Sequence, residues 1–266
     1  MHTTNFRRAK RSLLLGLAAV ALSLGAQAQS VLDDVIKAKE IKIAIPTDFP
    51  PYGFVGPDLK PQGLDVEMAQ YIASKLGVRV ELVVVTSANR IPYLQTKKAD
   101  LVISTLGKNP DREKVIDFTA AYSPFFLAVF GGKPLAVKGP ADMAGKSVSV
   151  TRGSVEDTEL TRLLPAGAEV RRFEDNNATI SAYVAGQVQM LAAGAQVASV
   201  MMTRNPQLGT ELKFVLKDSP NFIGVAKGED KLRLKVNEII LAAKRSGDLD
   251  RMAVKWLGRP SGDLPL

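Results

Sequence analysis

The amino-acid sequence predicts an α/β protein made of two lobes with a cleft between them. Short runs of β-branched and aliphatic residues, typical of strands, alternate with longer runs that repeat apolar residues at helical spacing. Such alternation favours a mostly parallel sheet covered by helices. The pattern stops at residues 122–132 and then begins again, so the chain contains two α/β units. Two junctions, near residues 125–131 and 219–224, connect these units and predict that the chain crosses twice between the lobes.

The first 28 residues predict a cleaved secretory signal and not a part of the fold. Four basic residues between positions 7 and 11 precede an apolar run over residues 13–24, and Ala26-Gln27-Ala28 supplies the small residues of a cleavage site. The apolar run is too short to cross a bilayer comfortably. We therefore expect an exported, periplasmic protein.

In the first unit, strands and helices follow from the spacing of apolar residues. Residues 41–45 predict a strand, and a proline-rich loop follows over residues 46–61. Apolar residues then recur at every fourth position from 64 to 76, directly before Gly77, which predicts a helix with a glycine stop. Residues 78–85, rich in β-branched side chains, predict a buried strand, and residues 101–104 predict another.

Arg112 falls in the first turn of a short predicted helix, in which Asn109 is the N-cap and Pro110 the first residue. The positive end of the helix macrodipole repels a cation at this place. A helix N-terminus with a guanidinium beside it binds a carboxylate or a phosphate well. The alternative is that Arg112 pairs with a nearby acidic residue on the surface.

Arg90 is a second candidate for binding an anion. It precedes Ile91 and Pro92 at the end of a predicted loop, with Ser87 close before it. An exposed loop arginine is usually solvated, so the nearby Ser87 and the family resemblance described below are what favour a role in binding.

The second unit repeats the alternation. The predicted strands cover residues 146–151, 169–173, 189–193, 212–216 and 222–226. The predicted helices cover residues 154–164 and 177–185, and a helical region over 231–257 ends the chain. Ser154 begins the first of these helices and has Asp157 at capping-box spacing. The free backbone N–H groups of the helical turn that follows Ser154 would point at a ligand if this N-cap faces the cleft.

Composition argues against several classes of function. The 35 basic and 27 acidic residues give a formal net charge of +8. Four of the basic residues belong to the signal, which leaves +4, and without a basic run this gives nucleic acid little support. There is no cysteine, and the one histidine, His2, lies in the signal, which argues against thiol chemistry, histidine-based hydrolysis and histidine metal sites. We expect no cofactor and no metal.

Eight short segments occur in an order and spacing that is distinctive only as a set. They are PPY at 50–52, GLDVE at 63–67, NRIP at 89–92, KADLVI at 98–103, DREKVIDF at 111–118, GKSV at 145–148, GS at 153–154 and KWLG at 255–258. Through them the chain resembles the bacterial solute-binding proteins of amino-acid ABC transporters, with the type II periplasmic-binding-protein fold. The resemblance covers nearly all of the mature chain and is nearest to the glutamate/aspartate-binding subgroup.

The resemblance implies a first lobe of residues 29–125 and 222–266 and a second lobe of residues 126–221, joined by two hinge segments, with the ligand clamped between them. It implies that Arg112 holds the ligand α-carboxylate and that Arg90, with Ser87, holds a side-chain carboxylate. The full predicted ligand-binding set is Phe49, Ser87, Arg90, Ser104, Thr105, Gly107, Arg112, Thr151, Ser154 and Gly194. Most of these residues follow predicted strands, where open α/β sheets bind ligands. Structural roles are expected instead for Tyr52, Asp65 and Trp256, and a surface position for Arg152.

One departure from the family pattern concerns the ligand amine. Members usually carry an acidic residue after the strand matching residues 189–193, and it binds the ligand ammonium. This chain has Gly194-Ala195-Gln196 there. A buried ammonium without a carboxylate would be costly. Either an amine-free acid binds better, or another acidic residue reaches the amine.

The leading hypothesis is a monomeric periplasmic protein, not an enzyme, that delivers an acidic amino acid or related small carboxylate to an ABC transporter permease. The first alternative is an enzyme similar to the periplasmic cyclohexadienyl dehydratases, whose catalytic glutamate follows the same strand. Residues 194–197 offer no such acid. The second alternative is a ligand sensor that docks on a membrane receptor.

Overall fold

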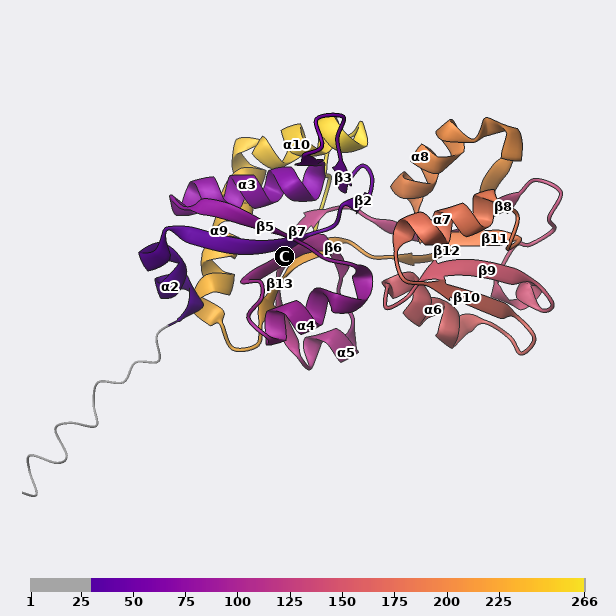
Figure 1. The fold of residues 1–266 in the computed structure, drawn as a ribbon, viewed down its shortest axis with the longest axis horizontal. Coiled ribbons are helices and arrows are strands. Elements are labelled where there is room, and N and C mark those ends of the chain that lie inside the picture. Colours follow the sequence, from indigo (N-terminus) through magenta and orange to yellow (C-terminus); the bar gives the residue numbers. More distant parts are fainter. Residues whose placement is uncertain (1–29, 266) are drawn as a thin grey trace, which may run out of the picture.

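The structure is a computed structural model that describes residues 30–265 as two lobes (Figure 1). The predicted signal at residues 1–28 lies outside the described residues. The first lobe contains α2 (Val31–Ala38), β1 (Glu40–Ile45), β2 (Asp48–Phe49), β3 (Gly53–Val55), β4 (Pro61–Gln62), α3 (Leu64–Leu76), β5 (Arg79–Val84), η1 (Ser87–Asn89), α4 (Arg90–Gln95), β6 (Leu101–Gly107), α5 (Pro110–Glu113), β7 (Ile116–Ser123), β13 (Asn221–Ala226), α9 (Asp230–Ser246) and α10 (Asp248–Leu257). The second lobe contains β8 (Phe126–Gly132), η2 (Pro140–Met143), β9 (Ser147–Thr151), α6 (Val155–Leu163), β10 (Glu169–Phe173), α7 (Asn176–Val184), β11 (Met190–Gly194), α8 (Ala195–Arg204), η3 (Pro206–Leu208) and β12 (Thr210–Asp218). The predicted two-lobed α/β fold is confirmed.

Each lobe is built on a five-stranded sheet of the same topology. The order is β5-β1-β6-β13-β7 in the first lobe and β10-β9-β11-β8-β12 in the second. In each sheet four strands run in one direction, as expected of a mostly parallel sheet, and the fifth, β13 in the first lobe and β8 in the second, is antiparallel to both its neighbours. The reason lies in the crossings: β8 and β13 start where the parallel strands end, so they run in the opposite direction.

The chain crosses between the lobes at two short segments. β7 ends at Ser123 and β8 begins at Phe126, while β12 ends at Asp218 and β13 begins at Asn221. The two crossings touch, because the Ser219 N–H donates to the Phe125 carbonyl oxygen at 2.9 Å. The first junction is shorter than the predicted 125–131, because most of that range belongs to β8.

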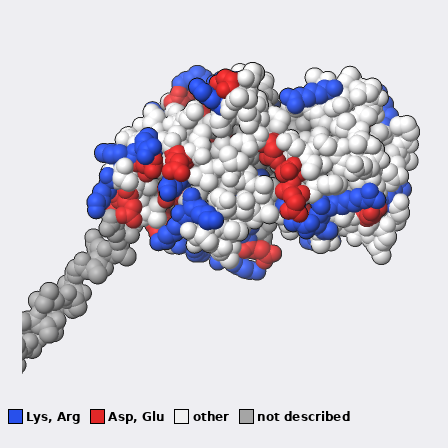
Figure 2. Space-filling model, in the orientation of Figure 1, with Lys and Arg blue, Asp and Glu red and all other residues white. Residues whose placement is uncertain are grey.

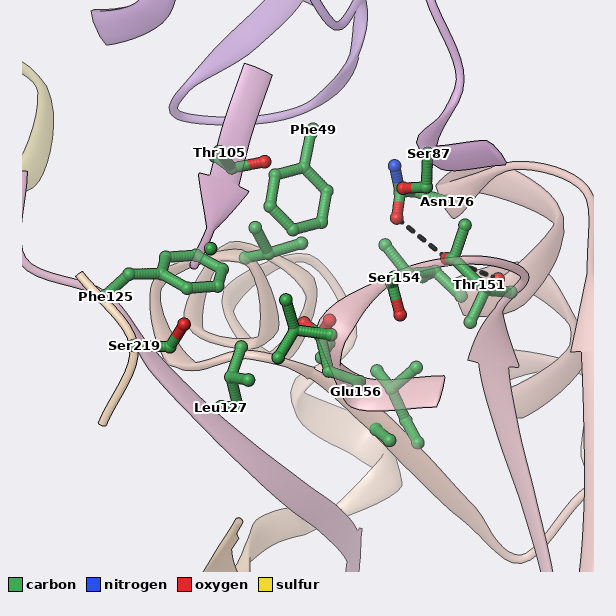
Figure 3. A pocket seen from close by; sticks show the side chains of 18 of the residues that line it. Phe49, Ser87, Thr105, Phe125, Leu127, Thr151, Ser154, Glu156, Asn176 and Ser219 are labelled. Carbon is green, nitrogen blue, oxygen red and sulfur yellow. Dashed lines mark hydrogen bonds between the residues drawn. The ribbon is translucent and has the colours of Figure 1, made fainter. Parts of the chain in front are cut away.

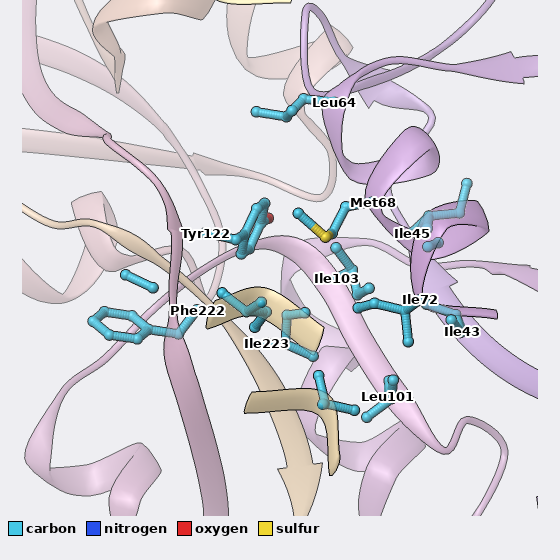
Figure 4. Packing of buried hydrophobic residues seen from close by; sticks show 14 of the residues in the cluster. Ile43, Ile45, Leu64, Met68, Ile72, Leu101, Ile103, Tyr122, Phe222 and Ile223 are labelled. Carbon is cyan, nitrogen blue, oxygen red and sulfur yellow. The ribbon is translucent and has the colours of Figure 1, made fainter. Parts of the chain in front are cut away.

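The core of the first lobe lies between its sheet and the helices α3, α9 and α10. Side chains from α3 such as Met68 and Ile72 pack on strand residues Ile43 and Ile103 (Figure 4). These side chains are fully buried, and each contributes about 1.5–3 kcal/mol by leaving water. The helix over residues 64–76 is confirmed, with Gly77 as a left-handed C-cap at φ 69°.

Several local predictions are wrong for tertiary reasons. β5 is an edge strand, and its side chains are half-buried or exposed where a buried strand was predicted. Arg90 begins a helix, α4, where a loop was predicted. The expected loop over residues 46–61 holds the small sheet β2-β3-β4, and the C-terminal helical region is divided at Gly247. The helices α2 and α8 were not predicted.

Tyr52, Asp65 and Trp256 have the structural roles expected of them. Tyr52 is fully buried and its hydroxyl donates to the Pro124 carbonyl at 3.2 Å. Trp256 donates from Nε1 to Glu67 at 2.7 Å. Across residues 30–265, no helix combines the length and the apolar character that a membrane span requires. On the face drawn in Figure 2, acidic and basic side chains are interspersed over both lobes.

Candidate functional site

A cavity lies between the lobes, at the carboxyl ends of the parallel strands (Figure 3). It is lined by Phe49, Ser87, Arg90, Thr105, Gly107, Phe125, Leu127, Thr151, Ser154, Val155, Glu156, Asn176, Thr179, Ile180, Leu191, Ala192, Ala193, Val197 and Ser219. Its free space is about 20 Å³, enough for about one water molecule. A ligand of several heavy atoms therefore needs the lobes to move apart before it enters.

Seven of the ten residues predicted to bind a ligand line this cavity. They are Phe49, Ser87, Arg90, Thr105, Gly107, Thr151 and Ser154. Ser104, Arg112 and Gly194 are buried near it but do not form its wall. Arg152, expected at the surface, is exposed there and pairs with Glu174 at 2.8 Å.

Arg90 presents a buried positive charge to the cavity. Only 5% of its surface is exposed. No hydrogen bond from its guanidinium to another residue of the described range is formed, and Nε is fully buried without an acceptor. Burial lowers the pKa of Arg90, and the negative charges of Glu156, Asp48 and Asp65 oppose that effect. A guanidinium in this state provides several donors for an anion that enters the cavity.

Arg112 joins the two lobes. Its N–H is bonded to the Asn109 side chain, the N-cap predicted for α5. Its guanidinium donates to the Gly107 carbonyl at 2.7 Å and, across the cleft, to the Gly153 carbonyl at 3.0 Å. Burial, followed by the positive charge of Arg90, lowers the pKa of Arg112 to about 10. Two of its five N–H groups are thus used within the protein, and no surface acid pairs with it in the described structure.

Thr105 stands in the cavity wall in a left-handed conformation, at φ 44°, which is strained for a β-branched residue. The buried carboxylate of Asp65 holds it there by accepting its N–H at 2.9 Å. Asp65 also accepts the Tyr122 hydroxyl at 2.6 Å, and burial raises the pKa of Asp65 to about 6. Ser104, the preceding residue, has a fully buried hydroxyl without a partner in the described structure.

The second lobe contributes the starts of α6 and α7. Ser154 is the N-cap of α6, as predicted, and its hydroxyl accepts the Asp157 N–H at 3.1 Å. The Thr151 hydroxyl donates to the Asn176 side chain at 2.8 Å. The N–H of Asn176, the first residue of α7, donates to Asp48 of the other lobe at 2.7 Å. Together with Arg112 and Gly153, this bond holds the lobes against each other.

Gly194 has no room for a side chain, because the phenyl ring of Phe125 lies where a Cβ would be. The ring belongs to an aromatic cluster at the hinge, with centroids 6.1 Å from Phe49 and 5.4 Å from Tyr52. The missing acid after β11 therefore has a steric explanation: Phe125 fills the space that such a side chain would enter.

Gly194→Ala is expected to lower the free energy of unfolding by about 1–3 kcal/mol, because the added methyl group overlaps the phenyl ring of Phe125 and overpacks the core there. The loss should shrink by half or more in a Phe125→Leu background. Urea titration of both single variants and the double variant measures this coupling. Gly139→Ala is the matched control, since its Cβ would meet nothing within 4 Å and should change stability by less than about 0.5 kcal/mol. Equal losses in both backgrounds would contradict the steric explanation.

Glu156 lines the cavity and was missed in the sequence, where Asp157 drew attention as the capping-box partner. It is the one carboxylate among the lining residues and has 6% of its surface exposed. Burial raises the pKa of Glu156. It lies two residues after the N-cap Ser154, in the first turn of α6, and no spacing signal in the sequence separates it from Asp157. The site thus holds a buried cation and a buried carboxylate, so it can bind groups of both charges.

Comparison with known proteins agrees with this geometry. The family model of bacterial extracellular solute-binding proteins, family 3, matches residues 41–259. The L-cystine-binding protein TcyJ of Escherichia coli is 28% identical over 257 residues, covering 93% of this chain and 96% of that protein. An L-arginine-binding protein of Pseudomonas aeruginosa is 29% identical and covers 88% and 94%. The crystal structure of the ancestral amino acid-binding protein AncCDT-1, a precursor of cyclohexadienyl dehydratase, superposes with a TM-score of 0.76 at 27% identity, covering 85% and 99%.

Proposed function

The chain belongs to the bacterial extracellular solute-binding proteins of family 3, and on that premise we propose that it is the substrate-binding component of an ABC transporter for an amino acid or a closely related small carboxylate. The relatives described above are named for amino acids, and the cavity between the lobes is placed as a ligand clamp requires.

The observation that carries the proposal is the buried guanidinium of Arg90. A cation taken out of water without an acceptor is costly, and an anionic ligand in the cavity would offset that cost. A carboxylate is the anion that matches a planar guanidinium in geometry. We assign the ligand carboxylate to Arg90.

The narrower hypothesis of an acidic amino acid depends on a second cation. Arg112 could hold a second carboxylate if lobe opening releases its bond to Gly153. The two curated relatives are named for cystine and arginine, so their names do not favour the glutamate/aspartate subgroup. An acidic ligand therefore remains a prediction that rests on the two arginines alone.

Binding is favoured over catalysis at this site. The relatives are named as binding proteins, and the neighbour related to cyclohexadienyl dehydratase is itself described as an amino acid-binding precursor. The dehydratase-like hypothesis requires a glutamate just after β11, and residues 194–197 include none; at Gly194 the ring of Phe125 also leaves no room for a side chain. We further propose that the protein acts as a periplasmic monomer that docks on a permease, with lobes of residues 29–125 plus 222–266 and of residues 126–221.

A thermal-shift screen tests the proposal. The twenty L-amino acids, L-cystine, glutarate and 2-oxoglutarate are each added to the mature protein. At least one carboxylate is expected to raise Tm by about 5–10 °C when present at 100 times its Kd, because binding to the native state alone then adds about 2.7 kcal/mol. Calorimetry on the compounds that shift Tm gives Kd. No shift with any of these compounds would contradict the function.

A further inference from the structure

The helix α6 carries two glutamates that are almost equally buried but differ in their partners. Glu159 has 7% of its surface exposed and pairs with Arg162 at 2.8 Å and Lys217 at 3.2 Å. Glu156 has 6% exposed, yet no described lysine or arginine nitrogen lies within 4.0 Å of its carboxylate. The two residues also differ in pKa. Hydrogen bonds and charge interactions with Arg162 and Lys217 outweigh burial and lower the pKa of Glu159, whereas burial raises the pKa of Glu156.

Glu156 and Arg90 line the same cavity from opposite lobes. Figure 3 shows Glu156 near Ser154 and Leu127 on the second-lobe wall, and Ser87, three residues before Arg90, on the first-lobe wall. Each charge favours the charged form of the other, but they form no ion pair. A buried carboxylate of this kind has lost much of its hydration without gaining a cation. A positive group that enters between the two walls would supply that partner.

Glu156 is stabilised by its own backbone N–H and by the Ser154 side chain but by no ion pair among the described residues, and the other acids near the cavity are engaged by other groups. Asp48 accepts both the backbone N–H and the side-chain amide of Asn176, at 2.7 and 3.1 Å. Asp65 accepts Thr105 and Tyr122 and does not line the cavity. At the end of β11, Phe125 excludes any side chain from Gly194. Within the described part of the chain, Glu156 is thus the acid that is both at the cavity wall and without a cation.

We propose that Glu156 binds the ammonium group of the ligand, and so makes the cavity select zwitterionic amino acids over amine-free acids of the same skeleton. The proposal rests on the amino-acid-binding function proposed above. Arg90 and Glu156 would then bind the carboxylate and the ammonium from opposite lobes, so that a zwitterion bridges the cleft while an amine-free acid leaves Glu156 unpaired. Glu156 is a specificity-determining residue in this arrangement.

Matched pairs of compounds test the proposal by calorimetry. The pairs are L-glutamate with glutarate, L-glutamine with glutaramate, L-arginine with δ-guanidinovalerate, and L-cystine with dithiodipropionate. For the pair that binds, the wild type is expected to prefer the amine-bearing member by roughly 10- to 150-fold, the range of a charge-assisted hydrogen bond. In Glu156→Gln this ratio should fall to about 3-fold or less, with the affinity of the amine-free member changed by less than about 3-fold.

Glu159→Gln is the matched control, because it changes an equally buried glutamate of the same helix that does not line the cavity, and its ratio should stay at the wild-type value. If circular dichroism shows that Glu156→Gln is unfolded, Glu156→Asp replaces it, and its shorter carboxylate should give an intermediate ratio. A wild-type ratio in the folded Glu156 variant would overturn the proposal. Equal affinity of the wild type for the amine-free and the amine-bearing member of a pair would also overturn the proposal, although the carboxylate-binding function would stand. If no member of any pair binds, the amino-acid function itself fails together with the proposal.

Discussion

Arg90→Met is expected to weaken ligand binding by about 30- to 5,000-fold and, at the same time, to raise the stability of the ligand-free protein. Removing one partner of a buried charged contact costs about 2–5 kcal/mol of binding free energy. In the ligand-free protein the guanidinium is buried without an acceptor. In other proteins, replacing a whole buried ion pair by apolar side chains of similar volume stabilises by about 1–4 kcal/mol, and the gain here is smaller because Glu156, Asp48 and Asp65 lose a favourable charge. The variant should therefore lose function and gain stability together.

Calorimetry with the compound found in the thermal-shift screen measures the affinity, and urea titration without ligand measures the stability. Arg152→Met is the control, because Arg152 is half exposed and pairs only with Glu174. It should leave the affinity within about twofold and the stability within about 0.5 kcal/mol. Wild-type affinity in Arg90→Met would show that the ligand carboxylate binds elsewhere.

Asp65→Asn is expected to destabilise the protein at all pH values and to do so most strongly in acid. An asparagine offers one acceptor oxygen where the carboxylate accepts both the Thr105 N–H and the Tyr122 hydroxyl. One buried donor then loses its acceptor, which costs about 1–3 kcal/mol near pH 7. The strained backbone of Thr105 also loses its anchor, so ligand affinity should fall as well.

The pH dependence follows from the pKa of Asp65, which is raised from 3.8 to about 6 in the folded protein. Between these values the folded state binds a proton that the unfolded state has released, so the wild type loses stability as pH rises from 4 to 6. This contribution amounts to about 3 kcal/mol, is fully present below pH 4 and is absent in Asp65→Asn. Urea titrations at pH 4, 5, 6 and 7 should show the wild-type advantage shrinking as pH rises. An advantage that is constant or grows over this range would refute the buried titration.

The sequence predicts those parts of the fold in which local spacing and tertiary packing agree. The helix over residues 64–76 is confirmed because its apolar positions are those that α3 turns toward the sheet. The edge position of β5 was not predictable, because a run of valines has the same pattern whether or not a neighbouring strand covers it. The helical start at Arg90 depends on Thr86, which caps the turn before it, and Pro92 directed the prediction toward a loop.

In the candidate site, too, local spacing predicts some features, and others depend on tertiary packing. Residues at strand ends were expected to converge, and Ser87, Thr105 and Thr151 do meet at one cavity. Arg112 was expected to hold a ligand carboxylate, which stays a prediction; its guanidinium donates to two backbone carbonyls that only the folded cleft brings within reach. Glu156 could not be ranked above its neighbour Asp157 from spacing alone. Its importance depends on the missing cation, which is a property of the tertiary arrangement.

A carboxylate at position 194 requires more than one substitution, because the ring of Phe125 must first give way. Alanine at position 125 would in turn loosen the aromatic cluster with Phe49 and Tyr52 at the hinge and cost about 3–5 kcal/mol. The order of mutational steps is thereby constrained, and the first step is harmful on its own. Lineages with little stability to spare would keep the glycine and adjust their ligand preference at other positions of the cleft, of which Glu156 is the most direct.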